Sequence, residues 1–498
     1  MTPEEKRKGL HEVYGTMYKN RKGIPEMLNW MEAAGFLDAP ASTKFHGCYP
    51  GGLADHSNNV YLRLLCLREV LGLSDQIPDD TLFVSGYLHD LCKIDFYAPT
   101  KKSVKNPLTK QWEDVDTYTI NEGFPFGHGE KSAQIAQNFL SISAHEALAI
   151  RWHMGGYREG EIRSVIEVWK KMRDQGNVPL VLMTHLADSI ATNVDESDIW
   201  PESCSAEHAT ISGWRVFRDK IPEIPEGTSN EEHYKLLFNH FLGKREGADK
   251  LLAYISGKQS DFFTAPADKM HFGSYPGGLC EQVLRMFYAM VWICDLLHFQ
   301  TFHTNIKVDG HATAVKLRAN LNIQSVTRIG RVVNEKIIPI EEYSQDKRAD
   351  GAMMLSFDSP IEPGKYVVWY TPDENTLMEA IAAATLLNGV GRINTFEVEW
   401  RNKKREDGTW DKIPFFYKNE EIPWGSSGAK SSFVCQPYMR IMRDESLALR
   451  WYEGPLDGDL DYPCNEGFSL SPLAFCAYVA FLLAAFTILP FGPKKKPQ

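Results

Sequence analysis

The stretch Gly86-Tyr87-Leu88-His89-Asp90-Leu91-Cys92-Lys93-Ile94-Asp95 places a histidine, an aspartate and a lysine inside an apolar run. Such a run is typical of a buried helix, which we expect over residues 78–95. Burying these three polar side chains is costly unless each one has a partner. A bound metal ion would remove that cost, because imidazole and carboxylate groups are metal ligands. The simpler alternative is a chance His-Asp pair at a helix surface, and the rest of the chain decides between the two.

Other histidines and aspartates lie on or beside predicted helices in the first 200 residues. They are His56, His128, His153 and Asp188. With His89 and Asp90 they give the order H…HD…H…H…D, with successive spacings of 33, 1, 38, 25 and 35 residues. Each of them alone is typical of a hydrogen-bonded structural residue. The six together indicate a metal centre.

The composition limits the classes of protein to which the chain can belong. The chain has 498 residues, of which 43% are hydrophobic and 24% are charged, so it can form two or three globular domains. A net charge of −11 argues against a broadly basic nucleic-acid-binding surface, although it leaves room for a local cationic groove. The nine cysteines include no C-x-x-C pair, which favours reduced thiols and a cytoplasmic location. The N-terminus has no apolar core of the kind that signal peptides carry.

The sequence contains an internal repeat. Residues 36–53, a segment rich in proline and glycine, recur at 262–279 without a gap and with a constant offset of 226. Three residues after the first copy stands His56, whereas the second copy has Gln282 at that position. We therefore expect a second, degenerate domain that has lost its first ligand.

The C-terminal segment 473–491 holds 19 residues without a charge, which is long enough for a membrane span. At an offset of 394, however, Leu82–Lys102 aligns with Cys476–Lys496. A buried helix that has lost its metal ligands would be apolar on all sides, so we interpret the segment as the degenerate counterpart of the His-Asp helix. Membrane contact through 473–491 is the alternative.

These patterns predict a mainly α chain. Residues 1–210 are expected to form an all-helical catalytic domain with N-terminal helices, and 211–250 a linker. Residues 251–300 and 471–498 would form the degenerate repeat. Between these two parts, 301–470 shows strand-type alternation and is predicted to be a mixed α/β insertion, which could bind a protein partner.

The chain resembles the HD-domain metal-dependent phosphohydrolases, in particular the HD domain of bacterial 3′–5′ exoribonucleases and related small HD hydrolases. The residues that carry the resemblance are Ala39-Pro40-Ala41, His46, Gly51 to His56, His89 to Lys93, Gly127-His128, His153 and Asp188. The match covers about residues 36–195. Two features depart from the pattern: Cys92 stands where relatives commonly have glycine, and the OB-fold with which the exoribonucleases hold RNA is missing.

The resemblance implies a site with two divalent ions. One would be held by His56, His89, Asp90 and Asp188, and the other by His128 and His153, with Asp90 bridging. Two cations about 3.5–4 Å apart can activate a water molecule and stabilise charge on a phosphoryl oxygen. Four imidazoles favour Mn²⁺, Fe²⁺, Co²⁺, Ni²⁺ or Zn²⁺, whereas an oxygen-rich site favours Mg²⁺. The sequence does not select among these ions.

Two further residues are candidates for contact with a substrate. Lys93 is expected to work beside Asp90 in catalysis and to contact a phosphate, because its ammonium group is a compact positive charge. His46 matches a family histidine that precedes the Gly-Gly turn, and it is expected to touch the substrate.

The predicted function is hydrolysis of phosphoester bonds in nucleotides or at the 3′ ends of nucleic acids, a substrate class that follows from the resemblance. A nucleotidase acting on free nucleotides is a second enzymatic reading, which the negative net charge and the missing OB-fold support. A third reading belongs to another class: a nucleotide-sensing or scaffold protein whose degenerate second half binds a partner.

Overall fold

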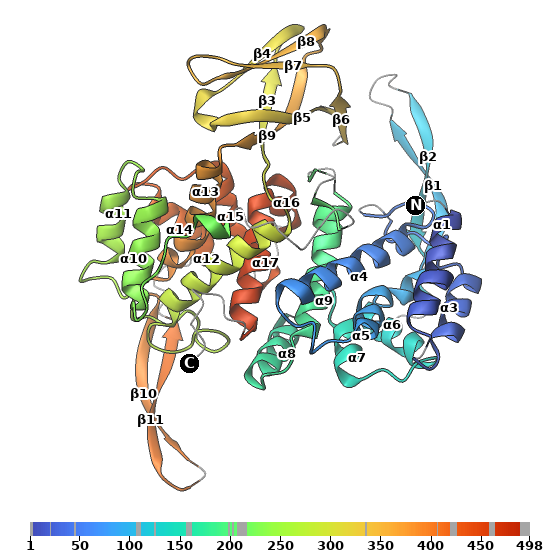
Figure 1. Ribbon diagram of the computed structural model, residues 1–498, viewed down its shortest axis with the longest axis horizontal. Helices are drawn as coiled ribbons and strands as arrows, with labels where there is room; N and C mark the ends of the chain where they lie inside the picture. Colours follow the sequence, from blue (N-terminus) through green and yellow to red (C-terminus); the bar gives the residue numbers. More distant parts are fainter. Residues whose placement is uncertain are drawn as a thin grey trace. The chain divides into compact units, whose positions relative to one another are not determined.

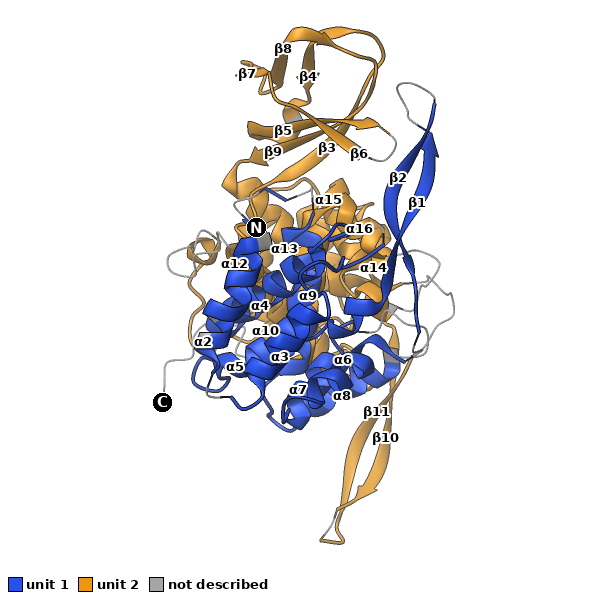
Figure 2. Cartoon of the chain, turned by 90° about the vertical axis from the view of Figure 1, so that its right-hand side faces the viewer, with its two compact units in different colours: residues 1–213 blue, residues 214–498 orange. Residues whose placement is uncertain are grey.

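The computed structural model of the chain divides into two compact units, residues 1–213 and 214–498 (Figures 1 and 2). The residues it describes are 3–19, 21–43, 46–105, 111–123, 126–155, 162–197, 200–201, 204–206, 217–333, 336–405, 407–418, 426–457 and 464–488.

The prediction of a mainly α chain is wrong. The chain is 48% helical and 20% strand, and the strands of its described part form four antiparallel sheets, so the fold is mixed α/β. One reason lies in the hairpins. Nearly every residue of strand β1 (Tyr97–Lys105) is exposed, so neither face of the strand needs apolar residues and the period-2 signal of a half-buried strand is absent.

Unit 1 consists of helices and one hairpin. Its α-helices are α1 (Pro3–Lys8), α2 (Gly15–Met17), α3 (Ile24–Ala33), α4 (Gly52–Val70), α5 (Asp79–Leu82), α6 (His128–Gln137), α7 (Ala144–Arg151), α8 (Ile162–Asp174) and α9 (Leu180–Ile190). Its π-helical and 3₁₀ segments are η1 (Gly9–Tyr14), η2 (Phe83–Tyr87), η3 (Leu91–Asp95) and η4 (Ala191–Asp195), and its hairpin pairs β1 with β2 (Trp112–Ile120). Helix α9 packs against α4 and α7, and it is buried along almost its whole length.

The segment expected as one helix over residues 78–95 is interrupted. After α5 the chain widens into the π-helical turn η2, makes a turn at 88–90, and continues as the 3₁₀ segment η3. His89 and Asp90 therefore stand on a turn. Short π-helical segments are rare and often occur at functional sites.

Unit 2 contains helices, a second hairpin and a β module. Its α-helices are α10 (Asn230–Phe241), α11 (Ala248–Ile255), α12 (Gly278–Leu296), α13 (Glu374–Leu386), α14 (Ser427–Cys435), α15 (Arg443–Trp451), α16 (Cys464–Leu470) and α17 (Pro472–Phe486), with 3₁₀ segments η6 (Arg218–Lys220), η7 (Ala319–Leu321), η8 (Asn388–Arg392) and η9 (Gly454–Asp457). The hairpin pairs β10 (Phe396–Lys404) with β11 (Trp410–Lys418). The stretch 211–250, predicted to be a linker, thus contains α10 and the start of α11, and α10 buries Tyr234, Leu237 and Phe238.

The β module follows α12. Its strands are β3 (Phe302–Val308), β4 (Ala312–Leu317), β5 (Ile323–Val333), β6 (Lys336–Ile340), β7 (Ser344–Lys347), β8 (Met353–Ile361) and β9 (Gly364–Pro372). They form one sheet in the order β3-β9-β5-β6 and another in the order β4-β8-β7. Among the described residues of the predicted insertion, strands occur in this module and in the hairpin.

The two units begin their long helices α4 and α12 with the same turn. Gly51 and Gly277 both have φ of 82° at the N-cap, a conformation that favours glycine. One residue into each helix, the amide of Leu53 donates to Ala39 O and that of Leu279 to Ala265 O, both at 3.0 Å. The sequence repeat is thus also a repeat in backbone conformation.

Beyond this turn, unit 2 still corresponds to unit 1, and equivalent residues now differ by 299 in number. Hairpin β1–β2 begins at Tyr97 and β10–β11 at Phe396, each within four residues of the end of a 3₁₀ segment. The amide of Cys92 donates to Ser132 Oγ at 3.1 Å, and that of Gly391 donates to Ser431 Oγ at 2.8 Å.

Two further pairs of contacts show which helix of unit 2 corresponds to α9 of unit 1. The guanidinium group of Arg151 lies 4.1 Å from the Trp152 ring centroid, and that of Arg450 lies 4.1 Å from the Trp451 ring centroid. A β-carbon on Gly155 would lie 2.5 Å from the ring of His185 on α9. One on Gly454 would lie 2.6 Å from the ring of Tyr478 on α17. Helix α17 therefore corresponds to α9, and not to the His-Asp segment as the offset of 394 suggested.

Unit 2 is thus a second copy of the unit 1 helical fold, with the β module inserted between α12 and α13. The offset rises from 226 to 299 across this point, so the insertion adds 73 residues (299 − 226). The helices α13 to α15, which fall within the predicted insertion 301–470, belong to the repeat.

The apolar C-terminal segment forms α17, all 15 residues of which are buried. The helix packs against α12 and α15. None of the helices in the described part combines the length and the apolar character that a membrane span needs. Residues 489–498, the end of the segment considered above, lie outside the described part.

Candidate metal centre

Helix α4 supplies His56 to the interior of unit 1. The turn before the helix is tight: a β-carbon on Gly52 would lie 2.1 Å from Gly47 O, so only glycine fits there. This turn starts α4 with His56 in its second turn, where the side chain is fully buried.

His89 and Asp90 reach the same place because η2 approaches α4 closely. A β-carbon on Gly86 would lie 2.6 Å from Leu64 Cδ1, so glycine permits this approach. The imidazole Nδ1 of His89 donates to Gly86 O at 2.6 Å. That bond fixes the ring and turns Nε2 toward α4, where it lies 3.2 Å from His56 Nε2.

His153 and Asp188 complete the cluster. His153 follows α7, and its Nδ1 donates to Ile150 O at 2.7 Å, so its Nε2 is turned toward Asp90. Asp188 lies on α9, with Oδ1 3.2 Å from His56 Nε2 and 4.0 Å from His89 Nε2. Elements far apart in the sequence thus bring five of the six predicted ligands together.

These side chains form adjoining groups that could hold a metal ion. His56, His89 and Asp188 offer one set of ligand atoms within 4.8 Å of one another, and His89, Asp90 and His153 offer another. His89 belongs to both groups. The side chain of Asp90 connects them, with Oδ2 3.2 Å from His89 Nε2 and Oδ1 3.4 Å from His153 Nε2.

The hydrogen bonding of the cluster fits a bound cation. Asp90 Oδ1 and His153 Nε2 are both buried, yet neither has a hydrogen-bond partner. Buried polar atoms without partners are costly, and a cation would satisfy both. Because His89 and His153 each donate from Nδ1 to a backbone carbonyl, the Nε2 lone pair of each neutral ring remains free to coordinate a metal, the arrangement found around histidine ligands in metalloproteins.

Electrostatics within the cluster point the same way. Burial alone would raise the pKa of Asp90, but the ammonium group of Lys93 and the neighbouring histidines hold it well below its usual range. Burial also opposes protonation of His56, yet the charges of Glu196 and Asp188 raise the pKa of His56 to about 10. The carboxylates are therefore ionised. Without a metal ion, protonated His56 partly balances their negative charge, and a bound cation would take the place of that proton.

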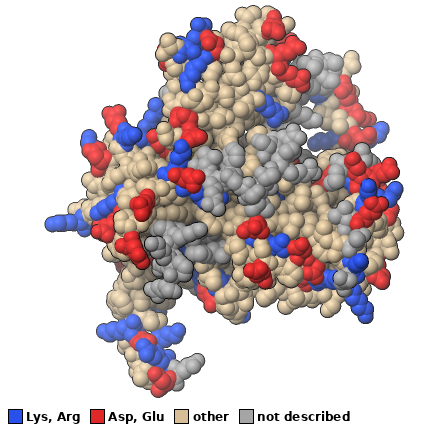
Figure 3. Space-filling view, viewed as in Figure 1, with Lys and Arg blue, Asp and Glu red and all other residues tan. Residues whose placement is uncertain are grey.

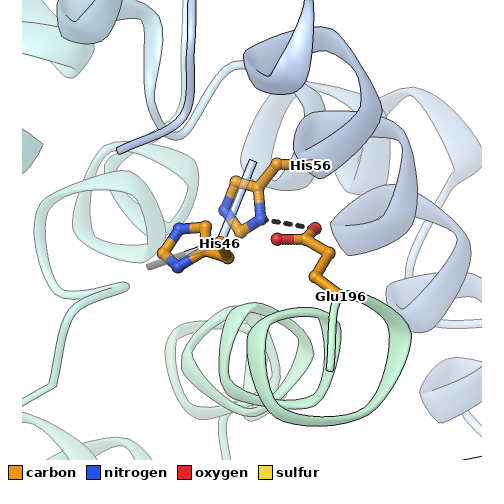
Figure 4. A group of neighbouring side chains, drawn as sticks. All are labelled: His46, His56 and Glu196. Atoms are coloured by element: carbon orange, nitrogen blue, oxygen red, sulfur yellow. Dashed lines mark hydrogen bonds and ion pairs between the residues drawn. The ribbon is translucent and has the colours of Figure 1, made fainter. Parts of the chain in front are cut away.

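The sequence pattern missed Glu196. Its Oε1 accepts from His56 Nδ1 at 2.9 Å and from Asn59 Nδ2 at 3.1 Å, as Figure 4 shows for the histidine. A carboxylate on the far nitrogen of a ligand histidine fixes the orientation of the ring and raises its basicity. The neighbouring Asp195 forms a buried bidentate pair with Arg63, also on α4, with both bonds at 2.8 Å. The spacing gave no signal for it, because a regular helix turns about 80° beyond two full turns in the eight residues after Asp188.

His46 lies on the other side of His56. The centroids of the two rings are 4.8 Å apart, and His46, His56 and Glu196 form a third group of potential ligands (Figure 4). Neither ring nitrogen of His46 has a hydrogen-bond partner. Burial and the positive charge of His56 lower the pKa of His46 to about 4, so its ring is neutral.

Two predicted site residues have other neighbours in this structure. His128, at the start of α6, lies with Nδ1 3.4 Å from Cys92 Sγ and packs against the ring of Phe96. None of the ligand groups among the described residues includes His128. Lys93, the predicted phosphate contact, has its Nζ 2.6 Å from Asp90 Oδ2.

No protein-family model, curated protein or solved structure matches this chain. The candidate site therefore stands on its own geometry: buried groups of histidine and aspartate that could hold a metal ion.

Proposed function

We propose that the chain is a metal-dependent phosphohydrolase of the HD-domain type, with its active site in unit 1. The observation that carries the proposal is the buried cluster of His56, His89, Asp90, His153 and Asp188. Three imidazoles, each with its ring orientation fixed by a hydrogen bond from Nδ1, and two ionised carboxylates form a donor set typical of transition-metal sites, and a metal ion on His56 would replace the proton that its raised pKa implies. Their convergence supports the resemblance to HD-domain hydrolases and the bond-cleaving chemistry that this resemblance implies.

Two ions are proposed, with the residues divided between them as the resemblance implies. His56, His89, Asp90 and Asp188 would hold the first. His153 and His128 would hold the second, sharing Asp90. Divalent ions bound there would supply Lewis acidity toward a phosphoryl oxygen and lower the pKa of a coordinated water. The unpartnered Asp90 Oδ1 and His153 Nε2 support the second position.

The residues of the chain itself would hold and orient the substrate. Lys93 keeps an ammonium group beside Asp90, and a phosphoryl oxygen entering the site would accept a hydrogen bond from it. The neutral ring of His46, with two free nitrogens, can donate to or accept from a substrate hydroxyl. Glu196 holds the ring of His56 in place.

The proposed substrates are nucleotides or single-stranded nucleic-acid ends, and the proposed location is the cytoplasm. The negative net charge supports a free nucleotide, whereas a polymer would need a local basic surface. None of the nine cysteines, all of which lie in the described part, forms a disulfide bond, which supports a reducing compartment.

The decisive experiment measures metal content and hydrolysis together. Purified full-length protein is incubated with Mn²⁺ and a panel of labelled single-stranded RNA and DNA and free nucleotides, and the products are identified by mass spectrometry. Asp90→Asn should abolish turnover and lower the bound metal, and His128→Ala should remove one ion of two. Asp95→Asn is the matched control, because it changes an exposed carboxylate five residues away, and it should retain activity.

Other outcomes decide between the alternatives. Stepwise shortening of the oligonucleotides would identify an exonuclease, and cleavage of free nucleotides alone would identify a nucleotidase. Bound metal without turnover of any substrate, or equal activity in Asp90→Asn and wild type, would contradict the hydrolase. In either case the sensor or scaffold reading, which unit 2 with its missing ligands supports, would replace it.

A further inference from the structure

The hairpin β10–β11 of unit 2 has two chemically different faces. Its register pairs Phe396 with Lys418 at the base and Lys404 with Trp410 at the tip. Because side chains alternate along a strand, the two residues of each cross-strand pair share a face, and successive pairs lie on opposite faces of the hairpin. One face carries Glu397, Glu399, Arg401, Lys403, Asp411, Ile413, Phe415 and Tyr417. The other, here called the tryptophan face, carries Phe396, Val398, Trp400, Asn402, Lys404, Trp410, Lys412, Pro414, Phe416 and Lys418.

All three acidic residues of these strands lie on the face opposite to the tryptophans, where arginines neutralise two of them. Arg401 pairs with Glu399 at 3.0 Å, and Arg405, at the turn, makes a bidentate pair with Asp411. The side chains of Arg401 and Glu399 also contact Tyr417. Figure 3 shows Lys, Arg, Asp and Glu side chains on the projecting hairpin, and the register separates them by face. The acidic face is therefore internally paired.

The tryptophan face combines exposed aromatic rings with lysines. Trp400 is 59% exposed and Trp410 is 65% exposed, which is unusual for the largest apolar side chain. Lys404 and Lys412 are exposed as well, and neither forms an ion pair with any described residue. No acidic residue of the two strands shares this face. The surface thus offers aromatic rings and positive charge together.

The equivalent hairpin in unit 1 shows no such separation. On β1–β2, Lys101 pairs across the strands with Asp116, and Lys102 on the other face has Glu113 as a diagonal neighbour. Asp114 lies on the same face as the exposed Trp112. Both faces of this hairpin thus carry acids and bases. The separation is a property of unit 2 and does not follow from the hairpin fold.

We propose that the tryptophan face of β10–β11 binds single-stranded nucleic acid. Bases would stack on Trp400 and Trp410, and Lys404 and Lys412 would contact the phosphates, the combination by which proteins hold single strands without sequence preference. A lipid surface fits less well. The hairpin tip carries Arg405, Asp407 and Asp411, which insertion into a bilayer would have to bury. The proposal does not depend on the hydrolase activity, because this face contains none of the metal ligands.

The test measures binding by the full-length protein in the presence of EDTA, so that hydrolysis does not interfere. The probe is a fluorescein-labelled oligothymidine, followed by fluorescence anisotropy at several salt concentrations. Trp400→Ala and Trp410→Ala should each weaken binding about tenfold, within the range measured for removal of one stacking platform. Trp→Phe at either position should keep much of the affinity. Phe415→Ala on the opposite face is the control and should have little effect.

The lysines give a second, matched comparison. Lys403 and Lys404 are neighbours on one strand and lie on opposite faces. Lys404→Glu should weaken binding and reduce the salt dependence, because a phosphate contact is lost, whereas Lys403→Glu should do so much less. Double-stranded DNA of the same length should bind more weakly than the single strand, since its bases are not free to stack.

Several outcomes would overturn the proposal. These are no binding by wild type at low salt, unchanged binding in both tryptophan variants, or equal effects of Lys403→Glu and Lys404→Glu. Binding to anionic vesicles that the tryptophan variants lose, with no oligonucleotide binding, would assign the face to a membrane instead. Loss of hydrolysis in Asp90→Asn with intact oligothymidine binding would leave this proposal standing. Metal-dependent hydrolysis that Asp90→Asn abolishes, together with oligothymidine binding that both tryptophan variants retain, would refute this proposal alone.

Discussion

Units 1 and 2 share one helical fold but differ at the positions of the candidate metal ligands. Where unit 1 has His56, unit 2 has Gln282, and where unit 1 has His89 and Asp90, unit 2 has Asn388 and Gly389. His153 corresponds to Tyr452. By the spacing of Gly155 from His185 and of Gly454 from Tyr478, Asp188 corresponds to Phe481. Unit 2 has therefore kept the helical fold without keeping the side chains of the candidate ligands.

A cation of the protein itself occupies this region in unit 2. Arg392, the counterpart of Lys93, pairs with Glu453, donates to Ala267 O and lies 5.7 Å from the ring centroid of Phe272, which replaces His46. The guanidinium group is satisfied by neighbouring groups of unit 2. The comparison teaches that a site built from histidines and carboxylates can be replaced by an arginine and aromatic rings without loss of the fold.

We expect the largest difference between the two units when one ligand of unit 1 is exchanged for its counterpart in unit 2. His153→Tyr should lower hydrolysis by about a thousandfold or more, as removal of a residue central to catalysis commonly does, and should reduce the bound metal. Tyr452→His should change neither, because its surroundings still lack the other ligands. Activity and metal content are measured on both variants. Equal behaviour of the two would show that the units are not distinguished by these ligands.

Both units contain the same buried ion pair, so removing it in each unit tests whether the pair stabilises the two copies of the helical fold equally. Arg21 makes a bidentate pair with Glu146, and Arg245 makes one with Glu445, and both glutamates are almost fully buried. Removing the arginine leaves a buried charge without its partner, so Arg21→Ala and Arg245→Ala should each lower the free energy of unfolding by about 3 kcal/mol. Hydrogen exchange measured by peptide should show faster opening in the affected unit.

Replacing both residues of the pair distinguishes the effect of an unpaired buried charge from the effect of lost packing. In Arg21→Met with Glu146→Leu, no buried charge is left alone, so most of the stability should return. Stability as low as that of Arg21→Ala would show that the pair acts through packing and not through charge.

The candidate ligands could be proposed from the sequence because histidine and aspartate in a buried run are costly without a partner. The fold beyond them could not. The repeat was visible only over the Pro- and Gly-rich loop, where Gly47, Gly51 and Gly52 are needed for the backbone. Beyond the loop, the β module changes the offset and His89-Asp90 becomes Asn388-Gly389, so sequence identity fades while packing is retained.

The placement of Glu196 shows another limit of the sequence. In a regular helix the residue eight positions after Asp188 would lie about 80° around the helix axis from it. The π-helical turn η4 instead closes with the amide of Glu196 donating to Ala191 O, five residues back. Glu196 and Asp195 then both reach α4, the one bonding to His56 and the other to Arg63. No sequence pattern used here signals such a turn.

The smallest expected difference concerns the start of α7 and its counterpart α15. Ser143 caps α7, its Oγ accepting from the amide of Glu146 at 3.2 Å while Glu146 Oε2 accepts from the Ser143 amide at 2.7 Å. In unit 2 the same position is Met442, whose amide donates to Glu445 Oε2 at 2.8 Å and whose side chain faces the amide of Glu445 with a thioether sulfur, a weak acceptor. Unit 2 has therefore kept the capping arrangement with a weaker acceptor than the serine oxygen of unit 1.

Exchanging the caps should change the stability of the two units in opposite directions. Ser143→Ala should lower the free energy of unfolding by about 1 kcal/mol, the usual cost of removing such a cap. Met442→Ser should raise it by about 0.5–1 kcal/mol, because a serine there can bond the amide of Glu445 as Ser143 bonds that of Glu146. Exchange rates of the first-turn amides of α7 and α15 report each effect locally. A destabilising Met442→Ser would mean that the packing of the methionine outweighs the stronger hydrogen bond that serine makes, and that the two helix starts are not equivalent.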